Sequence, residues 1–471
     1  MKDKKKVFII ILIFIVALSM FLSLFMLRES DYFWHIKAGE YMFKHGVLKK
    51  DIFSWSVRGK YWMSHEWLFE VILYWFKTIF SSYHLLVYGF VFLLSLLLIL
   101  FFTNKENYLK NPFFSSLWII GSSIMIPFMQ ARPHLISFSL LSLVIWFLYD
   151  LYKDENSKKI YFLPIISIIW ANVHGGSSNL VYLFCFIFVI GGLFNYSNSK
   201  IEFRKNTKKQ NLKYLMMGLV SALTVNINIH GFKMFLYPYQ NMMNKVMISN
   251  ISEWFPTNLN DFTHYTYVIF LVIIFMILLI GKKKINFMDL LLFGICVFLG
   301  LKSTRFWAYT YIIMSYVIFN YVNNNSDIEG LILGISSCIC IFLLSAFINR
   351  NSFIDRYNSK YLSNNVIKTI KRENPKRLFN KYDFGGELVY NDIDVFVDGR
   401  ADLYSKYTFE NYLIINRFET GVFDLINSYK FDYYLVTEDM AIYNYLISNP
   451  NYLKVYNEKN VYLFRNVNAD V

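Results

Sequence analysis

The chain has 471 residues, of which 56% are hydrophobic and 20% aromatic, and its mean hydropathy is +0.36. This composition excludes an ordinary soluble protein and indicates a membrane protein. The formal net charge of +14 lies entirely in residues 1–349, spread over several loops, whereas residues 350–471 hold 16 basic and 16 acidic side chains. A nucleic-acid partner is excluded, because a nucleic-acid-binding protein gathers its basic charge on one compact surface.

Apolar runs divide the first 349 residues into about eleven predicted membrane-spanning helices. The first run follows the basic start MKDKKK without a small-residue cleavage site, which indicates a retained signal anchor. The predicted spans are Val7–Leu27, Leu85–Phe102, Phe113–Met129, His134–Tyr149, Ile160–Val173, Asn179–Phe194, Tyr214–Ile229, Tyr265–Ile280, Phe287–Leu301, Phe306–Val322 and Gly330–Ile348. The expected fold class is a mainly α polytopic membrane protein with a soluble C-terminal α/β domain.

The positions of Lys and Arg predict how these spans are oriented. Eighteen of them fall at the N-terminus and in the loops that would share its side, and five fall in the short loops of the other side. Because cytoplasmic loops carry the excess of basic residues, the N-terminus is predicted to be cytoplasmic. The odd number of spans then makes the first loop, residues 28–83, and the C-terminal domain, residues 350–471, extracytoplasmic.

The first loop combines acidic, imidazole and indole side chains. It predicts an amphipathic helix over Asp31–Gly46, a polar connector over Val47–Ser64, and a second amphipathic helix over His65–Trp75 that runs into the second span. Asp31 and His35 share a face of the first helix, because they are four residues apart. An alternative for Asp31 is a structural role as the cap of that helix.

Polar groups recur at the outer ends of the predicted spans, as ARPH (131–134), NVHGG (172–176), NIHG (228–231) and KSTR (302–305). Charged and imidazole groups at membrane depth usually face a cavity or a partner, although each group alone could cap a helix end. Guanidinium and ammonium groups suit phosphate oxygens, so we expect these groups to bind the phosphate of a lipid-linked donor. The candidates are Arg132, His134, His174, Lys302 and Arg305.

The C-terminal domain alternates short β-type runs with helical patterns, which favours a mostly parallel sheet. The predicted strands are Arg377–Phe379, Glu387–Tyr390, Val395–Val397, Asp432–Val436 and Val461–Phe464, and the predicted helices are Lys406–Arg417, Val422–Ser428 and Met440–Ser448. Two acidic turns, YDFGG (382–386) and DGRAD (398–402), are either ordinary Asp/Gly turns or contacts for a ligand or acceptor at strand ends.

A carboxylate beside phosphate-binding groups suits the activation of an acceptor hydroxyl. We therefore expect Asp31 and Glu66 to be the catalytic residues of transfer from a lipid-phosphate donor. The ligand types of Asp31, His35, His65 and Glu66 also permit a divalent cation, although their spacing matches no known metal signature. The alternative is a hydrogen-bonded network that fixes the two loop helices.

This layout resembles the GT-C superfamily of glycosyltransferases, which have many spans, an acidic residue just after the first span, and two juxtamembrane helices in a large first loop. The first loop is similar to that of arabinose- and mannose-transferring members at Asp31, Ala38, Tyr41, Gly46, Tyr61–Trp62 and His65–Trp75. It departs from them where the second helix begins with His65–Glu66–Trp67 instead of a Pro pair. The segments WHIKAGE, HEW, ARPH, NVHGG and DGRAD also resemble a large set of bacterial membrane proteins along their whole length.

The resemblance implies a glycosyltransferase of the bacterial cell membrane. It would take a hexosyl or pentosyl group from a polyprenyl-phosphate-linked donor to an envelope glycan, lipid or protein on the outer face, surrounded by membrane lipids. One alternative is a transporter or flippase for a lipid-linked glycan, which would need polar residues toward both sides of the membrane, whereas these groups cluster on one side. Another alternative is a non-catalytic assembly factor for envelope polymers, which would tolerate a neutral residue in place of Asp31.

Overall fold

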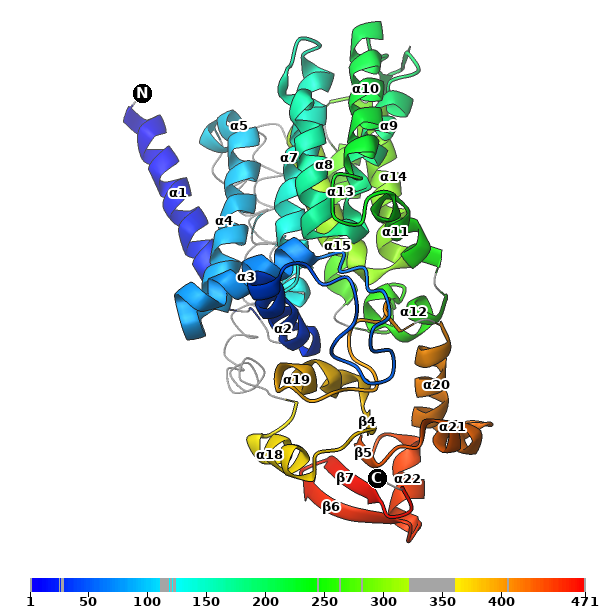
Figure 1. Cartoon of the computed structure of the whole chain (residues 1–471). Helices are drawn as coiled ribbons and strands as arrows, with labels where there is room; N and C mark the ends of the chain where they lie inside the picture. The colour runs from blue at the N-terminus through cyan, green and yellow to red at the C-terminus, as the bar shows by residue number, and fades with distance from the viewer. Residues whose placement is uncertain are drawn as a thin grey trace. The chain divides into compact units, whose positions relative to one another are not determined.

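The computed structural model describes residues 2–24, 26, 29–110, 118, 121, 124–243, 245–261, 264–280, 283–321, 361–404 and 406–469. It is mainly helical with a C-terminal α/β region, as expected (Figure 1). Contacts divide it into two compact units. The helical unit comprises the described residues within 1–27 and 80–354, and the loop–domain unit comprises those within 28–79 and 355–471.

The helical unit consists of helices, short 3₁₀ turns and one small sheet. Its helices are α1 (Lys2–Ser23), α4 (His84–Thr103), α5 (Lys105–Lys110), α7 (His134–Lys153), α8 (Leu163–Val173), α9 (Leu180–Gly191), α10 (Lys208–Thr224), α11 (Phe232–Met243), α12 (Lys245–Asn250), α13 (Tyr265–Ile280), α14 (Phe287–Lys302) and α15 (Trp307–Tyr321). Its 3₁₀ turns are η1 (Ser81–Tyr83), η3 (Ile126–Phe128), η4 (Lys159–Phe162), η5 (Gly175–Ser177), η6 (Ser252–Trp254) and η8 (Thr304–Phe306). Its sheet pairs β1 (Tyr196–Ser197) with β2 (Ile201–Phe203) and β2 with β3 (Ile285–Asn286).

Three helical stretches of the described residues are long and apolar enough to cross a membrane, namely Lys4–Ser23, Trp67–Thr103 and His134–Lys153. Shorter apolar helices cover Lys159–Val173, Gly175–Gly191 and Tyr265–Ile280. All six overlap predicted spans. The predicted spans Phe113–Met129 and Gly330–Ile348 lie mostly or wholly outside the described residues. The count of about eleven and the cytoplasmic N-terminus therefore stay predictions.

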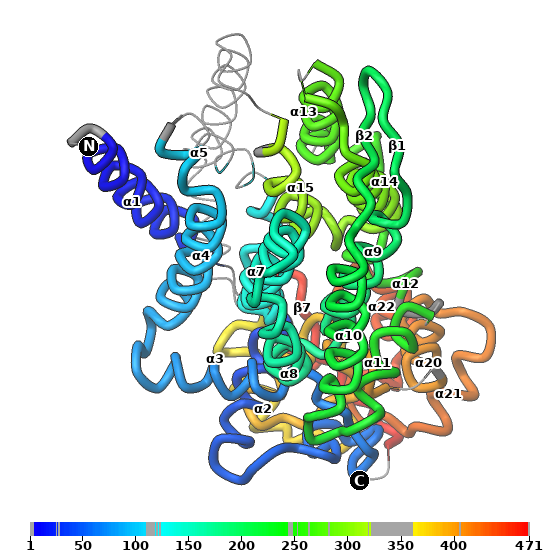
Figure 2. The backbone as a smooth tube through the Cα atoms, turned by 90° about the horizontal axis from the view of Figure 1, so that it is seen from above, coloured from blue at the N-terminus to red at the C-terminus, as the bar shows by residue number. Residues whose placement is uncertain are grey.

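Close helix packing builds the core of the helical unit, in which α9 and α10 lie side by side (Figure 2). A buried carboxylate, that of Asp289 at the start of α14, ties three helices together. It accepts hydrogen bonds from Tyr149 of α7 and from Tyr321 of α15, the latter over 2.7 Å. Because its hydrogen bonds come from phenols of neighbouring helices, this carboxylate has a structural role.

The loop–domain unit begins with α2 (Ser30–His45) and α3 (Trp67–Phe80) from the first loop. From the C-terminal domain it contains the helices α18 (Asn364–Glu373), α19 (Gly385–Tyr390), α20 (Lys406–Arg417), α21 (Val422–Tyr429) and α22 (Ala441–Ser448), the turn η9 (Tyr382–Phe384), and the strands β4 (Leu378–Asn380), β5 (Tyr433–Val436), β6 (Tyr452–Glu458) and β7 (Val461–Asn466). The strand order is β4-β5-β7-β6. Leu378 pairs with Tyr433 in the parallel β4–β5 ladder, and Tyr434 pairs with Phe464 in the antiparallel β5–β7 ladder.

Several predictions for the C-terminal domain are wrong. The sheet is mixed rather than mostly parallel, since β7 pairs antiparallel with both β5 and β6. Glu387–Tyr390 is part of the helix α19, and Val395 forms a single bridge to Ser54 in place of a strand. Short apolar runs do not distinguish a strand from a buried helical turn, which explains these errors. The helix α18 and the strand β6 were not predicted.

The two loop helices are confirmed with small shifts of their ends. α2 ends at His45, where Gly46 adopts a φ of 86° and its N–H bonds to the carbonyl of Met42. This left-handed φ is open to glycine and strained for most other residues, so Gly46 stops the helix. Gly39 of α2 lies against the backbone of Glu70 in α3, where a side chain would collide with the Glu70 carbonyl.

The polar connector between α2 and α3 packs into the C-terminal domain. The Trp55 ring lies 5.4 Å from the Phe396 ring and 5.7 Å from the Phe431 ring, measured between centroids. Its indole N–H donates to the carbonyl of Leu378 over 3.0 Å. The connector therefore supplies part of the hydrophobic core of a domain more than 300 residues later in the chain. The sequence did not predict this association, and the boundary at residues 349 and 350 lies outside the described residues.

Candidate functional site

Asp31 occupies the first turn of α2 in the loop–domain unit and is half-buried. Its Oδ1 accepts a hydrogen bond from the Trp34 indole over 3.1 Å. Glu29, and not Asp31, is the N-cap residue, and it makes no side-chain capping bond. The structural alternative for Asp31 as the helix cap is therefore wrong. A carboxylate in the first turn is nevertheless favoured by the positive end of the helix dipole.

Both acidic turns of the C-terminal domain reach the start of α2. Gly399 of the DGRAD turn lies directly against the Asp31 carboxylate. Gly386 of the YDFGG turn lies against the backbone carbonyl of Ser30, and partial burial together with the carboxylates of Asp383, Glu29 and Asp31 raises the pKa of the Tyr361 phenol to about 12. The DGRAD turn thus meets the residue predicted to be the catalytic base, and the YDFGG turn meets the residue before it.

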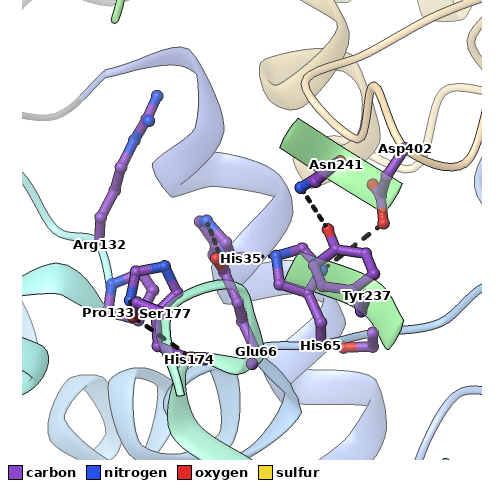
Figure 3. A network of polar contacts seen from close by, with 12 residues as sticks. His35, His65, Glu66, Arg132, Pro133, His174, Ser177, Tyr237, Asn241 and Asp402 are labelled. Atoms are coloured by element: carbon purple, nitrogen blue, oxygen red, sulfur yellow. Dashed lines mark hydrogen bonds and ion pairs between the residues drawn. The ribbon is translucent and has the colours of Figure 1, made fainter. Parts of the chain in front are cut away.

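Carboxylates and imidazoles alternate in a network between the loop helices and the C-terminal domain (Figure 3). Glu70 Oε1 lies 3.3 Å from His35 Nδ1, and His35 Nε2 lies 3.6 Å from Glu66 Oε2. Glu66 Oε1 lies 3.0 Å from His65 Nε2, and His65 Nδ1 lies 3.5 Å from Asp402 Oδ2. Each oxygen of Glu66 therefore faces one imidazole, and the network ends on the DGRAD turn.

His65 is held as a cation by this network. Burial lowers the pKa of its imidazole, but the carboxylates of Glu66 and Asp402 outweigh burial and raise the pKa to about 10. The protonated ring forms ion pairs with both carboxylates, the closer one from Nε2 to Glu66, whereas Nδ1 makes no hydrogen bond within the described residues. Within the described ranges, no three His, Cys, Asp or Glu side chains are arranged to hold a metal ion.

A buried ion triad lies on the other side of the DGRAD turn. Arg400 donates to Asp51 Oδ1 over 2.7 Å and to Asp398 Oδ2 over 2.6 Å, and all three side chains are fully buried. The guanidinium also lies between the rings of Phe53 and Trp62, 5.1 and 4.8 Å from their centroids. Its charge is neutralised by side chains of its own unit, so this triad fixes the connector to the domain.

In the helical unit, the segments NVHGG and KSTR come together. Arg305 of η8 approaches His174 Nε2 with one guanidinium nitrogen over 3.4 Å. The guanidinium lies 5.0 Å from the centroid of the Trp254 ring, a stacking arrangement that arginine favours. No carboxylate of the described residues forms an ion pair with Arg305, and its side chain is half-buried.

His174 follows the last residue of α8 and is buried. Its Nδ1 lies 2.7 Å from Ser137 Oγ and 2.9 Å from Ser177 Oγ, the latter contact drawn in Figure 3. Trp170 donates to both hydroxyls over 3.0 Å. Because a guanidinium can only donate, Nε2 is the acceptor in the contact with Arg305.

The turn η6 links Arg132 to Arg305. Arg132 forms an ion pair with Glu253. The next residue, Trp254, contacts the Arg305 guanidinium with its ring. Ser303 fixes this turn by donating to the Glu253 carbonyl over 2.9 Å. Arg132 therefore pairs with a carboxylate, whereas Arg305 is held by an aromatic ring and contacts an imidazole.

The two remaining candidates are turned to other partners. His134 bonds through Nε2 to the carbonyl of Phe128, a contact within its own loop. Lys302 is exposed, and its ammonium lies 6.0 Å from the centroid of the Phe298 ring on the same helix.

The predicted site residues thus fall into two groups, one in each unit. Sequence reasoning missed Glu253 and Trp254, for which an acidic–aromatic pair in a loop between predicted spans was the available signal. It also missed the pairing of Asp402 with His65, although it had singled out the DGRAD turn.

No protein-family model and no curated protein matches the chain. The archaeal oligosaccharyltransferase AglB from Archaeoglobus fulgidus, solved in complex with an inhibitory peptide and a dolichol-phosphate, has a TM-score of 0.53 and 11% identity. The match covers 98% of this chain and 74% of that one. The apo form of the Archaeoglobus fulgidus oligosaccharyltransferase has a TM-score of 0.52 and 11% identity, covering 98% of this chain and 75% of that one.

The chain has a GT-C fold. The expected resemblance is confirmed for the fold, because the structural match covers 98% of the chain. At 11% identity the match concerns the GT-C fold alone.

Proposed function

We propose that the chain is a GT-C-type membrane glycosyltransferase that moves a sugar from a polyprenyl-phosphate-linked donor to a cell-envelope acceptor on the outer face. The observation that carries this proposal is Arg305. Its guanidinium is held in place by Trp254 and His174, and no described carboxylate pairs with it. A half-buried arginine in this state offers two parallel N–H donors to a phosphate.

An apolar pocket beside Arg305 supports a lipid-linked donor. It is small, with an internal volume of about 30 Å³, and lies between α9, α14 and α15. Phe306, the residue after Arg305, lines the pocket together with Phe184 and Tyr309. A phosphate on Arg305 would therefore lie next to apolar side chains, which suits an amphiphilic donor.

The acceptor chemistry is proposed for Asp31. Its carboxylate would take the proton of an acceptor hydroxyl as the hydroxyl oxygen forms a bond to the sugar. The bond between the sugar and the donor phosphate breaks in the same step, and polyprenyl phosphate is the leaving group. Each carboxylate oxygen of Glu66 faces one imidazole. We therefore assign Glu66 the role of holding His35 and His65 in place and of stabilising their positive charge. Arg132 and His174 are proposed to support the phosphate site around Arg305.

The test is Asp31→Asn, which removes the base but keeps an oxygen that can accept the Trp34 hydrogen bond. Transfer should fall roughly 10²- to 10⁴-fold, the usual contribution of general-base catalysis. Glycans released from cell envelopes would be measured by mass analysis, at equal membrane abundance of each variant and beside a deletion strain. Asp394→Asn is the control, because Asp394 is half-exposed and its ion-pair partner among the described residues is Arg58 of the first loop.

An unchanged glycan profile in the Asp31→Asn strain, against a clear change in the deletion strain, would contradict the catalytic role. The function would then be that of a lipid-linked glycan transporter or a non-catalytic assembly factor. A transporter would still move labelled lipid-linked glycan into inverted vesicles, whereas an assembly factor would not.

A further inference from the structure

Gly399 makes an unusually close approach to Asp31. A methyl group placed on Gly399 would lie 1.7 Å from Asp31 Oδ1 and 2.7 Å from Trp34 Nε1. Carbon atoms in folded proteins do not approach oxygen or nitrogen this closely without a bond. The hydrogen bond from Trp34 to Asp31 therefore exists in its present geometry only because residue 399 has no side chain.

Two other glycines of the acidic turns have a different function. A methyl group on Gly386 would meet the backbone carbonyl of Ser30 at 2.0 Å, and one on Gly385 would meet the carbonyl of Val397 at 2.4 Å. These glycines let backbone segments approach each other. At Gly399 the nearest atoms are side-chain atoms of Asp31 and Trp34, so the contact concerns the orientation of the carboxylate.

The DGRAD turn is fixed on both sides of Gly399 and has little freedom to retreat. Asp398 and Arg400 are joined to each other and to Asp51 in the buried ion triad. Asp402 contacts His65 over 3.5 Å. A side chain at residue 399 would therefore be accommodated by rotation of the Asp31 carboxylate and not by movement of the turn.

We infer that Gly399 is a positioning residue that holds the Asp31 carboxylate in the orientation needed to take a proton from the acceptor. This inference rests on the proposed function, in which Asp31 is the base. The Trp34 indole holds one carboxylate oxygen, the missing side chain at residue 399 leaves room for it, and the ion triad keeps the turn in place. The acceptor hydroxyl then meets a carboxylate that is already oriented.

The experiment compares Gly399→Ala with Gly294→Ala, since a methyl group on Gly294 in α14 would meet no atom within 4 Å. The envelope glycan product should fall about 100-fold for Gly399→Ala, the usual result of misplacing a reacting group by about 1 Å. Gly294→Ala should leave it unchanged. Binding of farnesyl phosphate, used as a probe of the donor phosphate site, should be the same in both variants.

A double-mutant cycle tests the contact between Gly399 and Asp31 without using activity. It compares the melting temperatures of purified full-chain variants. Gly399→Ala should lower the melting temperature more in the natural background than in an Asp31→Ala background, where the carboxylate is absent and only the contact with Trp34 remains. An equal decrease in both backgrounds would overturn the contact. If Gly399→Ala does not accumulate in membranes, Trp34→Phe removes the indole donor without adding atoms and should also lower the product.

The two failures are distinguishable. Full product with Gly399→Ala, while Asp31→Asn loses it, overturns the positioning role and leaves the proposed function intact. Full product with Asp31→Asn overturns the proposed function, and the positioning role fails with it. Loss of product in both variants, together with coupling in the melting temperatures, supports the inference.

Discussion

Arg400 in the loop–domain unit and Arg305 in the helical unit have opposite surroundings. Arg400 is fully buried between two aromatic rings, and two carboxylates of its own unit neutralise it. Arg305 is half-buried, lies on a single indole and contacts the imidazole of His174. The histidines repeat the contrast, since His65 lies between two carboxylates, whereas Nδ1 of His174 contacts two serine hydroxyls.

This difference separates structural charge from charge that is available to a ligand. A buried arginine with both its partners satisfied has no capacity left for a further anion, and its removal leaves buried carboxylates without a partner. An arginine held by stacking keeps its charge for an anion that arrives from outside. Three experiments break or sharpen this comparison.

The largest effect is expected for Arg400→Met. Asp51 and Asp398 would then be buried without a counter-charge, which costs about 3–5 kcal/mol of stability. The loop–domain unit should melt at a much lower temperature or fail to fold. Thermal unfolding of the full chain in detergent, together with protease resistance of the first loop, measures this effect.

Arg58→Ala is the matched control, because Arg58 and its partner Asp394 are both about half-exposed. Exposed ion pairs contribute about 0–1 kcal/mol, so this variant should melt close to the natural protein. Equal melting temperatures for Arg400→Met and Arg58→Ala would remove the distinction between the two arginines.

A smaller effect is expected for Arg305→Ala. It should weaken binding of farnesyl phosphate roughly 10- to 100-fold, because a hydrogen bond to a charged group contributes about that much to affinity. The melting temperature should hardly change, because no described carboxylate depends on Arg305. Arg305→Lys should recover part of the binding, since it restores the charge but not the planar fork.

Lys302→Ala is the control for charge alone, because Lys302 is exposed and lies beside Phe298 on its own helix. It should bind the probe almost as the natural protein does. Weaker binding in Lys302→Ala than in Arg305→Ala would move the phosphate site away from Arg305.

The smallest effect is a pH dependence caused by His65. Its folded pKa, about 10, lies above the ordinary value of 6.5. The stability from its charge is therefore fully present below pH 6.5 and is lost as the pH rises toward 10. The natural protein should lose stability over this window more steeply than His65→Gln, as measured by urea unfolding at each pH.

The difference between the two proteins is the quantity to compare, because Lys60 also titrates in the alkaline range. Burial lowers the pKa of the Lys60 ammonium, against the opposing effect of Asp402. Parallel pH profiles for the natural protein and His65→Gln would show that His65 carries no charge in the folded state.

The sequence by itself determined the features that depend on local patterns. Apolar runs identified the helices of membrane-spanning length, and helical periodicity located α2 and the whole of α20. The residue types at span ends identified Arg305 and His174, which the structure brings into contact. These features depend on side chains that are close in the sequence, or on the chemistry of single residues.

Only the tertiary structure decided which charges are paired. Arg400 and Asp51 are 349 positions apart, so nothing in either neighbourhood distinguishes a buried triad from a ligand-binding turn. The same holds for Trp55, which completes a core formed by a distant domain, and for Gly399, whose role depends on the place of the Asp31 carboxylate. Hydrophobic burial and ion pairing act through space, and the sequence records only the order of residues along the chain.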